Sequence, residues 1–107
     1  MRETLCKLLC LSAVLWSGAI SADVYPQRQQ ELRYLLKHDC GSCHGMQLKG
    51  GLGPALTQQR LQPWSTEQLA TTILNGRPGT PMPPWEPFIN AAEAHWLADQ
   101  LKKGIQQ

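Results

Sequence analysis

The stretch Cys40-Gly-Ser-Cys43-His44 constrains this chain more than any other feature, because it brings two thiols and an imidazole together within about one turn of backbone. C-x-x-C-H is the arrangement by which a haem is attached covalently. Each cysteine can form a thioether to one of the two vinyl groups on the porphyrin edge, and the adjacent histidine is then held beneath the iron. Because a haem brings its own redox chemistry, these five residues predict one covalently attached haem c.

Three other chemistries use similar donors. A structural zinc site could include His38, but such sites usually take a second ligand pair, and the chain has no second C-x-x-C and no H-x-x-x-H. A thioredoxin-like redox pair needs a βαβ context, which the sequence does not predict. A disulfide between Cys40 and Cys43 would close too short a loop to stabilise much. Haem attachment accounts best for the adjacent His44.

Residues 1–22 have the pattern of a secretory signal peptide. A positively charged start precedes an apolar run over residues 8–16, and small residues follow at 19–22. The run is shorter than the ~20 apolar residues that span a bilayer. We expect cleavage after Ala22, with cleavage after Ser21 and retention as an uncleaved anchor as the alternatives. Export predicts a periplasmic protein, and cleavage removes two of the four cysteines.

The remaining residues, 23–107, are expected to form one domain. Without Arg2, Lys7 and Glu3 the chain carries eight basic and seven acidic side chains, so no strong basic field is present. This charge balance, with no groove-reading motif, argues against nucleic-acid binding. A domain of this size buries a limited core and usually needs a further stabilising group, a role that the haem fills. We expect a compact monomer.

Three helical patterns and no strand alternation predict an all-α fold. The patterns cover about 27–39, 65–76 and 90–103. The second begins with a capping box of Ser65 and Gln68, and the third begins with Asn90 followed three residues later by Glu93. The first leads directly into the cysteine motif. Three or more helices are therefore expected to wrap around one covalently bound haem.

The second axial ligand is predicted in the proline-rich loop Thr80–Trp85, where Met82 stands between two prolines that restrict the backbone. The alternative for Met82 is an ordinary core methionine that fills a gap beside aromatic side chains. Met46 lies too close to His44 to reach the opposite haem face. His38 and His95 are expected to be poorly placed for the distal side.

The order of these features resembles that of the small class I monohaem cytochromes c. It comprises an N-terminal helix, C-x-x-C-H, Gly53-Pro54-Ala55-Leu56, a middle helix, a methionine loop and a C-terminal helix. Residues 38–45, 49–57 and 75–85 are more narrowly similar to the NirC-type cytochrome of denitrification gene clusters.

The resemblance implies roles for particular residues. Cys40 and Cys43 would form the thioethers, and His44 and Met82 would ligate the iron. The carbonyl of Pro54 would accept a hydrogen bond from the proximal imidazole. Leu56 would pack on the haem. Trp64 and Arg60 are candidates for contacts with the haem propionates, with simple rim residues as the alternative. The candidates for the surround of the exposed haem edge, or for simple cover of the haem, are Met46, Leu48, Pro83 and Trp85.

An iron with histidine and methionine ligands has no open position for a substrate, so the expectation is a one-electron carrier and not an enzyme. The resemblance implies a periplasmic partner, the cytochrome cd-type nitrite reductase. An accessory role in maturation of the d-type haem of that reductase is one alternative. A haem sensor or haem enzyme, with a displaceable Met82, is the other.

Overall fold

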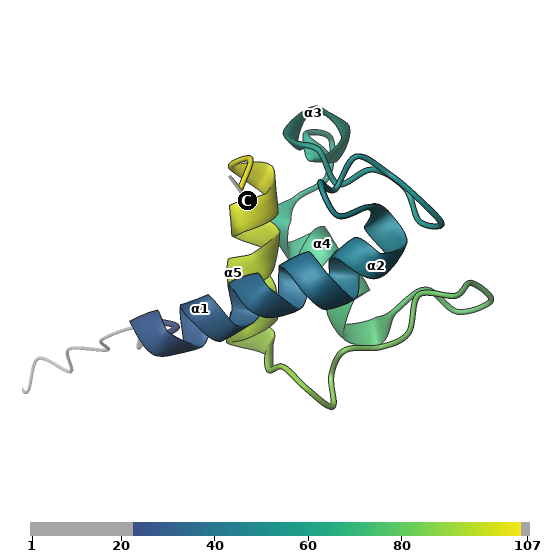
Figure 1. Ribbon diagram of the computed structural model, residues 1–107. Helices are drawn as coiled ribbons and strands as arrows, with labels where there is room; N and C mark the ends of the chain where they lie inside the picture. The colour runs from purple at the N-terminus through teal and green to yellow at the C-terminus, as the bar shows by residue number, and fades with distance from the viewer. Residues whose placement is uncertain (1–22, 106–107) are drawn as a thin grey trace, which may run out of the picture.

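The computed structural model describes residues 23–105, and the signal-peptide prediction for residues 1–22 lies outside them. Six helical segments follow one another in this range, without a strand among the described residues, which confirms the all-α prediction. They are α1 (Pro26–Leu35), η1 (Leu36–Cys40), α2 (Gly41–His44), α3 (Gln58–Leu61), α4 (Thr66–Asn75) and α5 (Ala91–Lys102) (Figure 1). Within residues 23–105 no helix has the length and apolar character needed to cross a membrane.

The N-terminal helix extends further than the sequence pattern predicts. Pro26 opens α1, where its missing N–H costs nothing, and the helix then continues through η1 into α2 as far as His44. The η1 segment is a π-helix in which the N–H of Gly41 donates to the carbonyl of Leu36, five residues back. This wider turn changes the helical phase just before the haem motif. Leu32 and Leu36 remain in the core.

The two predicted capping boxes are both present. The Ser65 hydroxyl accepts from the N–H of Gln68 at 3.0 Å, and the Gln68 side chain accepts from the N–H of Ser65 at 2.9 Å. Asn90 and Glu93 make the same reciprocal pair at the start of α5. These bonds satisfy donors that a helix N-terminus leaves free, so local sequence is enough to define where α4 and α5 begin.

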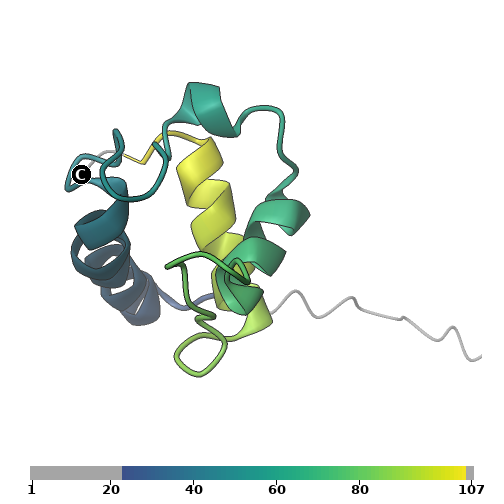
Figure 2. The same cartoon turned by 90° about the vertical axis from the view of Figure 1, so that its right-hand side faces the viewer.

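Helix α5 packs against α4 and supplies much of the core, with Ala94, Leu97, Ala98 and Leu101 buried. It is tied to α1 by Arg28, whose Nε donates to a Glu93 carboxylate oxygen at 2.6 Å. In the turned view, α2, α3, α4 and the loop that precedes α5 surround the near side of α5 (Figure 2).

Helix α3 and the cap residue that precedes it were not predicted. Thr57 caps this short helix through its hydroxyl, which accepts from the N–H of Arg60 at 3.4 Å, and Leu61 is buried in the core. Leu48 was expected among the residues around an exposed haem edge, but it is only 5 % exposed and belongs to the core. Its φ of 55° is left-handed, a conformation that costs a leucine energy and that its burial offsets.

Candidate functional site

The cysteine motif opens into an apolar cavity of about 310 Å³ that is bordered by residues of η1, α2, α3, α4 and α5 and of the loops between them. Cys40, Cys43 and His44 border it from the N-terminal helix, and Met82 borders it from the loop between α4 and α5. The other lining residues are mostly apolar and include Leu36, Leu52, Leu56, Leu61, Leu69, Ile73, Trp85, Leu97 and Leu101. Residues 42 positions apart in sequence therefore border one cavity.

The imidazole of His44 is held in one orientation from two directions. Its Nδ1 lies 2.7 Å from the carbonyl oxygen of Pro54, the hydrogen bond that the resemblance implies. Because a carbonyl only accepts, Nδ1 carries the proton and Nε2 keeps its lone pair. The backbone of Gly53 lies against the ring, since a Cβ at that position would lie 2.9 Å from Nδ1 and Cε1. The side chain thus presents one defined nitrogen as a metal ligand.

The two cysteines are free thiols of intermediate exposure. Burial, with a smaller contribution from the neighbouring Asp39 carboxylate, raises the pKa of Cys40 to about 11. The thiol is therefore protonated at neutral pH, unlike the activated thiolate of a disulfide oxidoreductase.

The loop that carries Met82 is anchored to the end of α4. The carbonyls of Ile73 and Leu74, which a helix C-terminus leaves without partners, accept from the N–H groups of Trp85 at 3.1 Å and Glu86 at 3.2 Å. Within the loop, the N–H of Arg77 donates to the carbonyl of Met82 at 3.1 Å. The position of the methionine backbone is thereby set by main-chain contacts.

Gly76 allows this loop to approach the helix closely. Its φ is 65° and its ψ is −167°, a combination that is essentially restricted to glycine. A Cβ at Gly76 would lie 2.5 Å from the carbonyl carbon of Pro83 and 2.7 Å from the carbonyl oxygen of Met82. The helical pattern over 65–76 predicts only that a helix ends at Gly76, whereas the structure adds the close contact with the methionine loop.

The cationic part of the cavity lining comprises Arg60 and Arg77. The guanidinium carbon of Arg77 lies 5.9 Å from the centroid of the Trp64 ring, and Lys102 donates a hydrogen bond to the Trp64 carbonyl. Arg60 and Trp64 were sequence candidates for contacts with haem propionates, whereas Arg77 was missed. The signal for Arg77 was its place in the same loop as Met82. Two guanidinium groups in the lining of one apolar cavity match the charges of two propionates.

The other candidate residues lie outside this cavity. Met46 is exposed, and its sulfur lies close to Gly41 of the N-terminal helix. His38 is exposed on that helix, where its ring centroid lies 4.2 Å from that of Tyr34 with the ring planes tilted by 39°, and His95 is exposed on α5. Two thiols, an oriented imidazole, a thioether and two guanidinium groups thus line one apolar cavity, and this donor set fits a covalently attached haem.

Comparison with known proteins agrees with this chemistry. The family model described as "Cytochrome C oxidase, cbb3-type, subunit III" matches residues 27–100. Cytochrome c55X of Pseudomonas aeruginosa is 53% identical over 85 residues, which are 78% of this chain and 71% of the relative. Cytochrome c55X of Paracoccus denitrificans is 45% identical over 96 residues, which are 89% of this chain and 93% of the relative.

A solved structure of a c-type cytochrome NirC superposes with a TM-score of 0.73 at 52% sequence identity, covering 75% of this chain and 94% of that one. Membership of this family selects covalent haem attachment over the zinc, disulfide and thiol-exchange alternatives for the C-x-x-C-H motif. The chain therefore belongs to the class I c-type cytochromes, whose members bind haem c covalently and carry electrons.

Proposed function

We propose that residues 23–107 form a periplasmic monohaem cytochrome that is exported by a signal peptide at residues 1–22. Cys40 and Cys43 hold one haem c through thioethers, and His44 and Met82 are its axial ligands. When bound, the haem supplies a single one-electron Fe(III)/Fe(II) couple. The observation that carries this proposal is that His44 and Met82, from separate elements, border the same apolar cavity.

The protein contributes orientation, polarity and exclusion of water. Pro54 holds the imidazole through the 2.7 Å contact with Nδ1, so Nε2 is the nitrogen that ligates. Leu56 and its apolar neighbours keep the cavity dry. Arg60 and Arg77 compensate the propionate charges, which lowers the cost of burying them. When the haem is bound, His44 and Met82 would hold the iron from the protein side and leave no position open for a substrate.

The axial assignment is tested by Met82→Ala, with Met46→Ala as the matched control. We expect Met82→Ala to abolish the methionine-to-iron charge-transfer band of the oxidised protein and to allow rapid binding of external ligands. Met46→Ala should keep the band, because this side chain is exposed outside the cavity. An unchanged band in Met82→Ala would show that Met82 is not the iron ligand. A high-spin spectrum in the unaltered protein would favour a sensor or an enzyme.

We further propose that the electron acceptor is the cytochrome cd-type nitrite reductase. The support is the similarity to a c-type cytochrome NirC, together with the resemblance of the loops at 38–45, 49–57 and 75–85 to the NirC type. Stopped-flow mixing of the reduced protein with oxidised reductase should show electron transfer, and its absence would remove this partner.

Electron delivery and haem maturation are separated by a deletion strain. A pure donor predicts a reductase with a normal content of d-type haem that is reduced slowly in cells. A deficiency of d-type haem in that strain would instead identify an assembly factor.

A further inference from the structure

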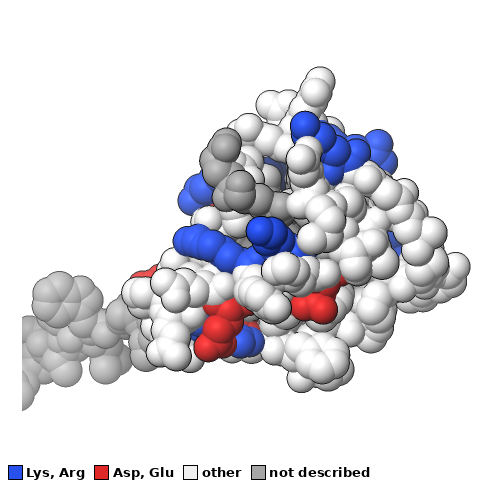
Figure 3. Space-filling model, in the orientation of Figure 1, with Lys and Arg blue, Asp and Glu red and all other residues white. Residues whose placement is uncertain are grey.

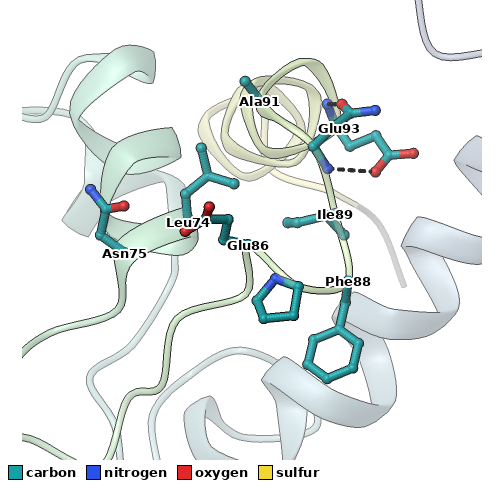
Figure 4. Close-up of a pocket in the computed structure, with 9 residues that line it drawn as sticks. Leu74, Asn75, Glu86, Phe88, Ile89, Ala91 and Glu93 are labelled. Carbon is teal, nitrogen blue, oxygen red and sulfur yellow. Dashed lines mark hydrogen bonds between the residues drawn. The ribbon is translucent and has the colours of Figure 1, made fainter.

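A second hollow, of about 740 Å³, lies between the end of α4 and the segment that leads into α5. It shares no lining residue with the haem cavity. Its lining is shown in Figure 4 and consists of Leu74, Asn75, Glu86, Pro87, Phe88, Ile89, Asn90, Ala91 and Glu93. The cytochrome function does not use this hollow.

The hollow combines apolar and acidic side chains. Phe88 is 66% exposed, a large apolar side chain that the fold leaves in solvent, while the neighbouring Ile89 is buried. Arg28 donates to the carbonyl of Phe88 at 3.1 Å and so holds this segment against α1. This hydrogen bond anchors the backbone that carries the exposed ring, and aromatic side chains such as phenylalanine are enriched at protein interfaces.

The charge around the hollow is negative. The lining of the hollow contains the carboxylates of Glu86 and Glu93 and no Lys or Arg, and Arg28, which lies outside the lining, is shared between Glu31 and Glu93. Glu86 adds a further exposed carboxylate, and within the described range it has no ion-pair partner. On the face of the molecule shown in Figure 3, the acidic atoms lie mostly in the lower part, whereas most Lys and Arg atoms lie above them. The haem cavity differs from the hollow in this respect, because its lining includes the positively charged Arg60 and Arg77.

An aromatic contact joins the hollow to the haem cavity. Trp85 borders the cavity, and its ring centroid is 5.7 Å from that of Phe88, with the ring planes at 56°. The N–H of Phe88 donates to the carbonyl of Trp85 at 2.9 Å, so a tight turn holds the two rings together. Because electron-transfer rates fall exponentially with distance, a packed connection from the cavity wall to the surface shortens the path to a partner docked there.

We propose that this hollow is a second docking surface, for a redox protein that presents an apolar side chain among Lys and Arg residues. The inference rests on the proposed electron-carrier function. Each encounter transfers one electron, so the partner is reduced by one equivalent as the carrier is oxidised by one. The hollow suits a small, transient interface of the kind that redox proteins form. Donor and acceptor with surface charges of opposite sign could then use separate faces.

Two small oxidants test this proposal on the reduced holoprotein. Tris(phenanthroline)cobalt(III) is cationic and apolar, and it represents the proposed partner, whereas ferricyanide is anionic. We expect Phe88→Ser and Glu86→Gln each to slow oxidation by the cobalt complex about two- to fivefold, as for loss of one exposed interaction, and to leave the ferricyanide rate unchanged. Glu86→Gln should also weaken the dependence of the cobalt rate on salt.

The matched controls are Tyr34→Ser and Glu67→Gln. Tyr34 is also 66% exposed and lies outside both linings, and Glu67 is an exposed carboxylate on α4. Neither control should change either rate. Equal cobalt rates in variants and controls would overturn the proposal.

A binding measurement that does not depend on electron transfer completes the test. The redox-inert chromium(III) analogue of the cobalt complex is paramagnetic and should broaden the backbone NMR signals of Asn75, Glu86 and Phe88 first. Broadening centred on Leu52 and Arg60 instead would overturn the proposal. Slow reaction with both oxidants would count against the carrier function itself, whereas fast ferricyanide oxidation with unaltered cobalt rates would defeat only the second surface.

Discussion

Replacing Gly76 by alanine should detach the methionine loop from α4. At φ 65° and ψ −167° a side chain costs on the order of 1–3 kcal/mol. The added Cβ would also lie 2.5 Å from the carbonyl carbon of Pro83, whereas carbon atoms in contact prefer about 3.5–4.0 Å. The loop and helix must therefore separate by about 1 Å.

This separation would break the 3.1 Å hydrogen bond from Arg77 to the carbonyl of Met82, which contributes about 1 kcal/mol. Together these terms predict a loss of about 2–4 kcal/mol in the free energy of unfolding of the holoprotein. Because the same displacement moves Met82, the methionine-to-iron band should weaken or vanish.

Gly79→Ala is the matched control for Gly76→Ala. Gly79 lies in the same loop with a φ of 78°, but a Cβ there would meet nothing within 4 Å. It should cost only about 1–2 kcal/mol for the left-handed backbone and should keep the band. Denaturant unfolding followed by circular dichroism, with absorbance of the oxidised protein, measures both effects. Equal stability losses in the two variants, with the band intact in both, would refute the contact as the restraint on Met82.

Three further predictions concern the core and the proximal side. Glu93→Gln should destabilise by about 1–2 kcal/mol at neutral pH, because it weakens the pair with Arg28. The pKa of Glu93 is lowered mainly by its hydrogen bond with Arg28, so the stability that this pair contributes is present above the unfolded pKa and is lost as the pH falls through the folded pKa. The urea midpoints of the unaltered protein and of Glu93→Gln should therefore converge from pH 6 to pH 3, and midpoints that stay equally far apart would contradict this. Leu97→Ala, at a side chain 1% exposed, should cost about 2–5 kcal/mol in thermal unfolding, and a loss below 1 kcal/mol would argue against its place in the core. Gly53→Ala should rotate the His44 ring, because the new Cβ would lie 2.9 Å from Nδ1. A shifted iron–imidazole stretch in the Raman spectrum would reveal the rotation, and an unshifted stretch would count against the contact.

The starts of α4 and α5 were predictable because capping boxes act through residues three apart, so Ser65 with Gln68 and Asn90 with Glu93 are visible in the sequence. The π-helix at Leu36–Cys40 was not, because nothing in the local composition distinguishes a π-turn from a continued α-helix. The short helix α3 was missed for a similar reason, since four residues give no periodic signal.

By itself, the sequence determined the chemistry of the site, because thioether formation and metal ligation depend on which side chains are present and on the spacing of C-x-x-C-H. Only the tertiary structure decided which distant groups join them. It brought Met82 and Arg77 to the same cavity as His44, moved Leu48 from the expected haem surround into the core, and left Phe88 exposed beside Trp85. These outcomes depend on how the loops pack on α4 and α5 and on main-chain contacts such as that of Gly76 with Pro83. The order of residues in the sequence does not give the distances between such groups, so these contacts could not be predicted from it.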